Sequence, residues 1–417
     1  MRIPLQNFFK GDKVIWMIFF FLCVISVIEV FSSSSMLVYK NESYWGPVSK
    51  HSFILVIGIV ITVVIQNIDC KYFKIATPFL LPLSFFALLW VLVAGHSTNG
   101  AQRWISFFGL QFQPSEIAKG TIVLATAQIL SAMQTEDGTE RNTFKYICTV
   151  TLPLLALIVF ENLSTAILIV VVVIGMMFYG RVSNKIIGRL VGGIALAGLL
   201  MVAMVFIIGE DEPVENDKQN LTEHIASKDE NADKKEDKSV FQDLFHRAGT
   251  WKKRIKKFVS TEEVPPEKFN LNKEDAQVGY SHIAIASSEF VGKGPGNSEA
   301  RDFLPQAFSD FIYAIIIEEM GLFGAIVVMA LYIFLLFRAG RIADRCENAF
   351  PAFLVMGLAL MLVIQAMFNM MVAVGLAPVT GQPLPLVSKG GTSTIINCIY
   401  IGAMLSVSIS AKKKADK

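Results

Sequence analysis

The sequence predicts an all-α polytopic integral membrane protein, with about ten transmembrane helices and a large extracytoplasmic loop between helices seven and eight. Of its 417 residues, 53% are hydrophobic and only 17% are charged. Several uninterrupted apolar stretches exceed the ~18 residues that mark a membrane-spanning helix. The formal net charge of +2 is divided among separate loops, so it indicates no nucleic-acid partner.

An even number of spans places both termini on one side of the membrane. Basic residues in short loops stay cytoplasmic, and they gather on the side of the termini, as Arg338, Arg341 and Arg345 do. We therefore predict cytoplasmic termini. No small-residue cleavage site follows the first span, so we expect a retained helix. The predicted spans are residues 14–33, 51–68, 75–95, 117–133, 145–160, 162–180, 184–209, 311–337, 350–374 and 391–411.

The spans divide the chain into three parts. Residues 1–209 hold transmembrane helices one to seven and an aromatic-rich segment, 99–116, which is too short to cross and is expected to lie in the membrane interface. Residues 210–310 form the large extracytoplasmic loop. Residues 311–417 hold helices eight to ten, with an extracytoplasmic loop at 375–390 and a cytoplasmic tail.

The large loop changes composition along its length. Residues 210–243 are acidic and poor in apolar side chains, which predicts a flexible hydrophilic insert. In residues 244–257, basic residues are interleaved with aromatic and aliphatic ones. That pattern is typical of an amphipathic helix on anionic headgroups, or alternatively of a contact with a phosphate on a substrate.

Two glycine-rich loops are candidate anion sites. In GKGPGNS, residues 292–298, backbone N–H groups can form an anion-binding nest, and Lys293 adds a positive charge. In SKGG, residues 388–391, backbone donors precede the last span beside Lys389, an arrangement that suits a phosphate. An ordinary turn is the alternative for each loop.

Charged residues also lie at the ends of predicted spans and inside one of them. Glu116 and Lys119 are spaced i, i+3, so they share a helical face and can form an ion pair. Asp310 opens span eight at headgroup depth, where it can act as a general base or as an ordinary N-cap or helix-start charge. Glu318 and Glu319 lie roughly 12 Å further along the helix. An ionisable group there costs at least ~2.5 kcal/mol, so we expect two structural polar groups that face the interior, paired or protonated.

Other chemistry finds little support in the sequence. The five cysteines show neither a disulfide framework nor metal-ligand spacing. The histidines are scattered, and no Ser-His-Asp or Cys nucleophile arrangement is suggested by spacing. No metal site is identifiable.

Four motifs occur in the order found in one protein family. They are GAQRWISFFGLQFQPSEIAKG at 100–120, IAIASSEFVGKGPGNS at 283–298, FLPQAFSDFIYAIIIEEMGLFG at 303–324 and PVTGQPLPLVSKGGTS at 378–393. With this layout of spans, the chain resembles the SEDS family (shape, elongation, division and sporulation) of the FtsW and RodA type, and it is more similar to FtsW.

The resemblance implies a peptidoglycan glycosyltransferase that polymerises lipid II into β-1,4 glycan strands at the outer face of the cytoplasmic (inner) membrane, in cell division or cell shape. Asp310 falls on the family's essential aspartate, which is proposed to deprotonate the acceptor 4-hydroxyl in an inverting displacement of undecaprenyl pyrophosphate. A divalent cation, Mg or Mn, is compatible with this chemistry. The implied partners are a class B penicillin-binding protein, which is the transpeptidase, and other divisome or elongasome membrane proteins.

The resemblance also assigns positions to substrate binding, with some departures from the family pattern. Ser288-Glu289 replaces Gly-Gly, Phe308 stands where a histidine is frequent, and Glu161-Asn162 replaces the Pro-Asp of a Pro-Asp-Leu-Gly-Thr stretch. Together with Lys293 in its loop, the candidate substrate-binding residues are Arg103, Glu116, Lys119, Ser388, Lys389, Gly390 and Gly391.

Two other functions stay open. A lipid II flippase would line a translocation path with the same charges, and Glu318 and Glu319 inside a span suit that function. A non-catalytic scaffold for a class B penicillin-binding protein would need no chemistry. A polymerase needs its decisive charges at the outer rim, where most of these candidates fall, whereas a transporter needs a set that reaches both faces. This distribution favours the polymerase.

Overall fold

The computed structural model describes residues 9–33, 45–94, 96–98, 101–107, 110–136, 138–208, 276–304 and 309–415. The chain divides into two compact units, residues 1–187 with 264–417 and residues 188–263. The sites described below belong to the first unit. The acidic insert and the basic segment of the large loop lie outside the described residues, as do Phe308 and the side chain of Arg103.

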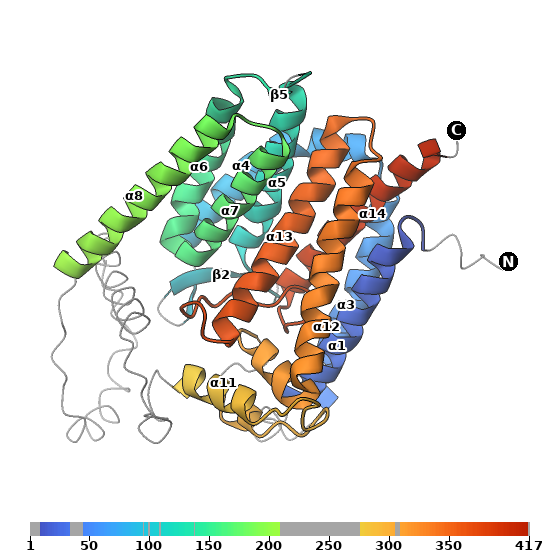
Figure 1. The fold of residues 1–417 in the computed structure, drawn as a ribbon, viewed down its shortest axis with the longest axis vertical. Helices are drawn as coiled ribbons and strands as arrows, with labels where there is room; N and C mark the ends of the chain where they lie inside the picture. Colours follow the sequence, from blue (N-terminus) through green and yellow to red (C-terminus); the bar gives the residue numbers. More distant parts are fainter. Residues whose placement is uncertain are drawn as a thin grey trace. The chain divides into compact units, whose positions relative to one another are not determined.

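Helices dominate the described chain, and each predicted span coincides with one of them. Apolar segments form helices in a membrane because every backbone group must then be satisfied within the segment. Among the described residues, seven helices are long and apolar enough to cross a membrane, and α7 is a shorter apolar helix; the number of crossings stays a prediction. The helices are α1 (Lys13–Ser33), α3 (Trp45–Gln66), α4 (Cys70–Ala94), α5 (Pro114–Ala132), α6 (Thr143–Glu161), α7 (Leu163–Tyr179), α8 (Asn184–Ile208), α11 (Ala276–Ala286), α12 (Ile312–Ala343), α13 (Ala349–Ala373) and α14 (Thr392–Ala415) (Figure 1).

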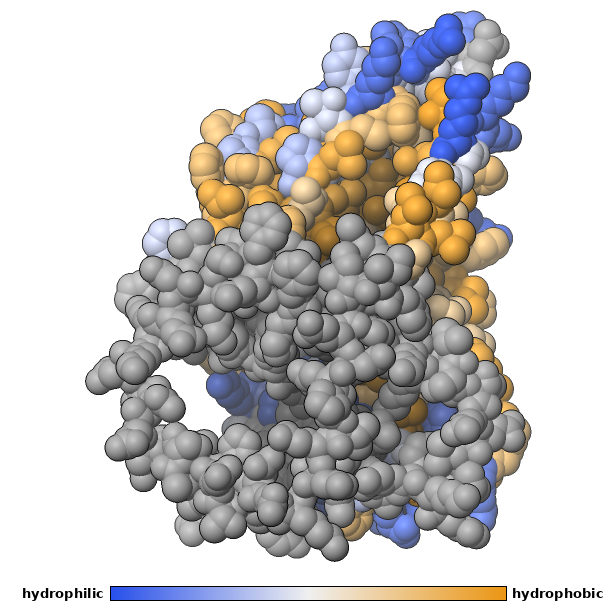
Figure 2. All heavy atoms as spheres, turned by 90° about the vertical axis from the view of Figure 1, so that its left-hand side faces the viewer, coloured by the Kyte–Doolittle hydropathy of each residue, from blue (hydrophilic) through white to orange (hydrophobic). Residues whose placement is uncertain are grey.

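Helix α13 lies at the centre of the helix packing. It contacts α5, α7, α12 and α14 (Figure 1). Of the residues in its apolar stretch, 67% are buried, whereas the corresponding share in α4 is 22%. Outer helices present large apolar side chains such as Phe79 and Phe86 to their surroundings. Figure 2 shows hydrophobic side chains over much of the visible coloured surface, with hydrophilic ones at its upper end and at its lower edge. Such an apolar exterior is expected where the solvent of the helices is lipid.

Short strands occur in two connections of this mostly helical chain. The segment predicted to be interfacial contains a three-stranded antiparallel sheet that leads into α5, and a two-stranded hairpin connects α5 to α6. Backbone that leaves a helix still needs hydrogen-bond partners, and strand pairing supplies them. The strands are β1 (His96–Thr98), β2 (Ala101–Phe107), β3 (Leu110–Phe112), β4 (Gln134–Thr135) and β5 (Gly138–Thr139).

Helix α7 begins at a residue where the chain departs from the family pattern. Asn162 Oδ1 accepts hydrogen bonds from the backbone N–H groups of Ser164 at 3.1 Å and Thr165 at 3.4 Å. Asparagine caps a helix about as well as aspartate does. The replacement of the family's aspartate therefore leaves the start of α7 intact.

Helix α12 is interrupted at Gly321, although its apolar run is continuous in sequence. Gly321 has φ +67° and ψ −170°, a conformation open to glycine but not to residues with a Cβ. An added Cβ at Gly321 would lie 2.2 Å from the Phe290 carbonyl oxygen, and one at Gly292 would lie 2.3 Å from the Gly321 nitrogen. The loop that follows α11 thus crosses α12 at the break, in direct backbone contact.

The same crossing gives the backbone of the two glutamates hydrogen-bond partners outside α12. The Glu318 and Glu319 carbonyl groups accept hydrogen bonds from the backbone N–H groups of Lys293 and Gly294, at 3.0 and 2.8 Å. Residues 322–343 follow the break and span about 33 Å at ~1.5 Å per residue, enough to cross a membrane on their own. The roughly 12 Å between Asp310 and the glutamates lies before the break, so the break does not alter it. The depth of the two glutamates in the membrane stays a prediction.

Candidate functional site

Asp310 lies two residues before α12, and neighbouring elements fix its backbone. Asn369 Nδ2 on α13 donates to the Asp310 carbonyl oxygen at 2.8 Å, and Ser388 Oγ donates to the Ser309 carbonyl oxygen at 2.6 Å. Ser309 Oγ donates to Asp310 Oδ1 at 3.0 Å. The N-cap residue of α12 is Phe311, so Asp310 is not the N-cap residue. The backbone of the candidate base is therefore positioned by α13 and by the loop between α13 and α14.

That loop is itself held by two amide side chains of α13. Gln365 Nε2 donates to the Pro383 carbonyl oxygen at 3.0 Å, and Asn369 Nδ2 donates to the Gln382 carbonyl oxygen at 2.8 Å. Because Gln365 and Asn369 are four residues apart, they lie on one face of the helix. Gln382 Nε2 donates in turn to Thr165 Oγ1 on α7 at 2.8 Å. Both α13 amides are buried, so the contacts order the loop in a place where unpaired polar groups are costly.

The end of the loop connects Asp310 to the first two described helices. Ser388 Oγ accepts from the Leu384 N–H at 2.8 Å while it donates to Ser309. The preceding carbonyl oxygen, that of Val387, accepts from Ser26 Oγ on α1 at 2.7 Å, and Ser26 Oγ also bonds to His51 Nε2 on α3. Ser388, predicted from sequence to belong to the site, thus lies between Asp310 and α1.

Glu116 and Lys119 form an ion pair in the interior of the helix packing. Lys119 Nζ lies 2.8 Å from Glu116 Oε1 and donates to Gln365 Oε1 at 2.8 Å. The Lys119 side chain is 0% exposed. A buried charge is tolerated only with partners, and these partners connect α5 to α13 and, through Gln365, to Pro383. The pair supports the loop that holds Asp310; contact of either side chain with a substrate stays a prediction.

Lys389 and the two glycines that follow it lie at the start of α14. Burial, together with the nearby Lys50 ammonium, lowers the pKa of Lys389. Two cations in a partly desolvated place attract an anion, because water screens them poorly there. Gly391 has φ +54°, and the Gly390 carbonyl oxygen accepts from the Ser393 N–H. The surroundings of Lys389 suit the predicted phosphate site; Arg103 cannot be placed there, because its side chain is not described.

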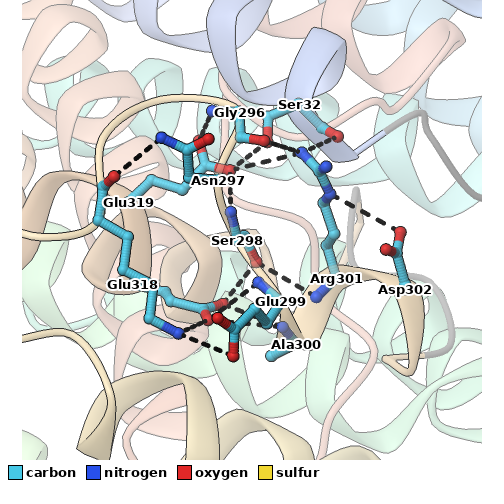
Figure 3. A network of polar contacts seen from close by, with 11 residues as sticks. Ser32, Gly296, Asn297, Ser298, Glu299, Ala300, Arg301, Asp302, Glu318 and Glu319 are labelled. Carbon is cyan, nitrogen blue, oxygen red and sulfur yellow. Dashed lines mark hydrogen bonds and ion pairs between the residues drawn. The ribbon is translucent and has the colours of Figure 1, made fainter.

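A second polar cluster surrounds Glu318, as Figure 3 shows. Lys293 Nζ donates to Glu318 Oε1 at 3.0 Å, Ser298 Oγ donates to Oε2, and the Glu299 N–H donates to Oε1 at 3.1 Å. The Lys293 ammonium also lies 3.3 Å from Glu299. The hydrogen bond that Lys293 donates to Glu318 raises the pKa of Lys293. This cation is engaged by carboxylates of the protein, and its predicted part in substrate binding stays untested.

Glu319 is bonded to the same loop and to the end of α1 (Figure 3). Its carboxylate accepts from the N–H groups of Gly296 at 3.0 Å and Ser298 at 3.2 Å, and from Ser32 Oγ. Arg301 Nη1 lies 3.9 Å from Glu319 Oε1 and donates to the carbonyl oxygens of Ser32 and Gly296 at 3.0 and 2.7 Å. Backbone N–H groups of GKGPGNS do bind an anion, and it is the Glu319 carboxylate of the protein itself.

Several of these positioning residues carry no clear local signal. Arg301 and Ser32 lie in unremarkable surroundings in the sequence. Gln365 and Asn369 were detectable in principle, because they are polar, four residues apart, and set in the apolar run MGLALMLVIQAMFNMMVA. A polar stripe inside an apolar helix indicates a buried partner.

These features define a class: a bundle of membrane helices with an aspartate at the start of one helix, held by the loop between the last two. A family model described as "Cell cycle protein", FtsW, RodA and SpoVE type, matches residues 12–220 and 240–413. The chain belongs to this family. The resemblance predicted from the four motifs is confirmed.

Individual relatives cover most of the chain. A probable peptidoglycan glycosyltransferase FtsW of Nitrosomonas europaea is 28% identical over 375 residues, 88% of this chain and 84% of that protein. The peptidoglycan glycosyltransferase MrdB of Escherichia coli is 27% identical over 402 residues, 95% of this chain and 93% of that protein.

Solved structures share the fold. The rod shape determining protein RodA of Thermus thermophilus has a TM-score of 0.62 and 21% identity, covering 96% of this chain and 98% of that chain. A chain from a structure described as "structural coordination of polymerization and crosslinking by a peptidoglycan synthase complex" has a TM-score of 0.68 and 21% identity, covering 98% of this chain and 99% of that chain. The predicted class of helical membrane protein is confirmed.

Proposed function

We propose that this chain is a peptidoglycan glycosyltransferase that polymerises lipid II into β-1,4 glycan strands. The observation that carries the proposal is the family match along nearly the whole chain, with relatives named peptidoglycan glycosyltransferase FtsW and MrdB. We favour a role in cell division, as the FtsW-like motifs and the FtsW relatives indicate, over a role in cell shape.

The reaction is a single displacement in which Asp310 is the general base. Its carboxylate takes the proton of the acceptor 4-hydroxyl while that oxygen forms a bond to C1 of the donor sugar. The bond from C1 to the pyrophosphate oxygen breaks, and undecaprenyl pyrophosphate leaves with the electron pair. Attack from the opposite face turns the α-linkage into a β-1,4 linkage. The hydrogen bond from Ser309 favours the ionised carboxylate, and the bonds from Asn369 and Ser388 hold the segment in position.

Charge on the leaving pyrophosphate is matched by cations at the start of α14. Burial and the nearby Lys50 ammonium lower the pKa of Lys389, so both disfavour its charged form. An anion bound beside Lys389 would offset both effects and stabilise the ammonium. Among the residues that the structure describes, no three His, Cys, Asp or Glu side chains converge as metal ligands. Participation of Mg or Mn stays a prediction.

The proposal includes an orientation and a partner. We place both termini in the cytoplasm and the Asp310 end at the outer face of the cytoplasmic (inner) membrane, because basic residues gather in the segments at the opposite end. A class B penicillin-binding protein is the proposed partner, with other divisome or elongasome proteins. It is supported by the fold shared with a chain of a complex described as coordinating polymerization and crosslinking.

The test is glycan-strand synthesis from labelled lipid II by the purified protein, with and without its partner. Wild type and Asp344→Asn, which changes an exposed aspartate at the far end of α12, should both give polymer. Asp310→Asn should give none while it still folds and binds the partner. A normal rate in Asp310→Asn would make Asp310 a helix-start charge and the mechanism wrong.

The same experiment separates polymerisation from transport. As charges inside a predicted span, Glu318 and Glu319 suited a flippase. In the structure they bond to the loop that crosses α12, so their presence in the span does not favour a flippase over a polymerase. If no form of the protein polymerises lipid II with any partner, flipping or scaffolding becomes the function to test.

A further inference from the structure

A cavity of about 300 Å³ lies at the end of α12 opposite to Asp310, among three elements far apart in the sequence. The segment before α1 forms one wall, the last turns of α12 form another, and α14 closes the third. It is lined by Gly11, Asp12, Lys13, Arg338, Ile342, Arg345, Ser408 and Ala411. None of these residues takes part in the proposed displacement reaction.

An ion pair forms the inner part of this cavity. Asp12 accepts from Arg338 Nε at 2.9 Å and Nη2 at 2.6 Å, and from the Val14 N–H at 2.9 Å. The Asp12 N–H donates to Ser408 Oγ at 2.9 Å. The carboxylate and the guanidinium thus neutralise one another and join α1, α12 and α14. The Asp12–Arg338 pair thus gives the cavity a rigid, preorganised wall against which a ligand can bind.

Two further cations line the cavity without such compensation. Lys13 and Arg345 are exposed, and neither forms an ion pair with any other residue that the structure describes. Arg338 lies in the last turns of α12 and Arg345 in the turn that follows the helix, and both line the cavity. With Asp12 balanced by Arg338, the cavity carries two uncompensated positive charges, which suits a phosphate group.

Apolar side chains continue from the cavity along the same helices. Phe337 on α12 is 60% exposed and Met17 on α1 is 51% exposed. Trp16 Nε1 donates to the Lys10 carbonyl oxygen at 2.9 Å, and tryptophan is typical of the boundary between membrane and water. A ligand held by the two cations would therefore have lipid-facing helix surface directly beside it. A soluble anion would make no use of that surface.

We propose that this cavity binds the phosphate headgroup of an anionic phospholipid, whose acyl chains lie along α1 and α12. Lys13 and Arg345 bind the phosphate, and basic residues near a membrane attract anionic lipid in this way. Bound lipid joins the beginning of α1 to the end of α12 and adds to the Asp12–Arg338 pair. Inorganic phosphate shares the charge chemistry and is separated from lipid by the test.

The test is lipid binding to the purified full-length protein, measured by native mass spectrometry with phosphatidylglycerol and with phosphatidylcholine of the same chains. Lys13→Gln/Arg345→Gln is compared with Lys74→Gln/Arg141→Gln, which removes two exposed cations that do not line the cavity. Wild type and the control pair should retain phosphatidylglycerol and prefer it to phosphatidylcholine. The cavity pair should bind phosphatidylglycerol roughly 30-fold more weakly, at about 1 kcal/mol per basic residue.

Three outcomes overturn the proposal. Equal loss in both double variants would assign binding to general surface charge. No preference for phosphatidylglycerol in wild type would remove the headgroup site. Displacement of lipid by millimolar inorganic phosphate, with the same dependence on Lys13 and Arg345, would make the ligand a free anion. If the double variant does not fold, each single variant, expected to lose about fivefold in affinity, decides in the same way.

Discussion

Asn369 positions the candidate base from a distance of 59 residues along the chain. Its amide bonds two carbonyl groups, those of Asp310 and Gln382, and so connects the start of α12 to the late loop. A catalytic base must be placed within a fraction of an ångström, because misplacement by about 1 Å can cost 10²-fold in rate. The amide is therefore as much a part of the proposed site as the carboxylate.

Asn369→Ala should lower the rate of polymerisation by about ten- to 100-fold with little change in KM, because Asp310 loses a positioning bond and no proposed substrate contact. Initial rates with labelled lipid II measure this. Asn67→Ala, an amide on the exposed side of the helices, is the matched control and should act like wild type. A wild-type rate in Asn369→Ala would show that the bond does not position the base.

Glu289 lies where the family has glycine, and the structure gives the reason for that glycine. Its φ is +45°, a left-handed conformation that costs a residue with a Cβ roughly 1–2 kcal/mol. Glu289→Gly should raise the stability by up to about 1 kcal/mol, since glycine also loses more entropy on folding. Thermal unfolding in detergent measures the change.

Glu299→Gly is the control for this prediction. Glu299 has φ −87° and ψ −36°, which suits any residue, so glycine there relieves no strain. It brings its entropic cost and removes an exposed ion pair with Lys293, and should lower stability. If both variants lose stability, backbone strain at Glu289 is not relieved by glycine and the account of that turn is wrong.

At the scale of elements, the break in α12 depends on two glycines on crossing segments. Gly321→Ala should destabilise the protein by about 2 kcal/mol or more, because the added Cβ would lie 2.2 Å from a carbonyl oxygen and the positive φ suits glycine only. Gly340→Ala on the same helix meets nothing within 4 Å and should be neutral or stabilising by up to about 1 kcal/mol. Unfolding midpoints of the two variants test the break, and equal midpoints would contradict it.

The helices were predictable and the break was not, for one physical reason. Hydropathy and helical period are local properties, so each apolar stretch indicates its own helix. The conformation of Gly321 is set by Phe290 and Gly292, about thirty residues away on another segment, and GLFG inside an apolar run carries no signal of that contact. The strands between residues 96 and 112 were missed similarly, because an aromatic-rich segment indicates an interface more directly than a pairing.

The candidate site was predictable to a similar extent. The spacing of Glu116 and Lys119 predicts their ion pair, and the structure contains it. Their common partner Gln365 could not be deduced, because an amide can bond almost any polar group. The glycine-rich loop was expected to bind an anion, but a sequence does not say whether that anion is a ligand or Glu318 and Glu319 of the protein itself.

At the scale of the molecule, the Asp12–Arg338 pair joins helices from both ends of the chain. Burial raises the pKa of Asp12. The hydrogen bond and charge of Arg338, with two backbone N–H groups, lower it by more, so the pKa in the folded protein is below its ordinary value of 3.8. A carboxyl group with a lowered pKa stabilises the folded state fully above its unfolded pKa. That stabilisation is lost as the pH falls through the folded value.

The difference in thermal stability between wild type and Asp12→Asn should therefore be constant at neutral pH and shrink as the pH falls below 3.8. Melting curves in detergent from pH 7 to pH 3 measure it, with Asp344→Asn as the exposed control at the same end of α12. A difference that grows on acidification would contradict the lowered pKa.

The contact between Asp12 and Ser408 joins residues 396 positions apart, and it also bears on the order of events during synthesis. Helix α1 is synthesised before α14, yet the partners of Asp12 and Ser26 include Ser408 and the Val387 carbonyl group, which the ribosome has not yet made at that stage. Until α14 is synthesised and inserted, these polar groups must therefore bond to water, to lipid headgroups or to an assisting protein. Translation of the late segments completes the packing of α1.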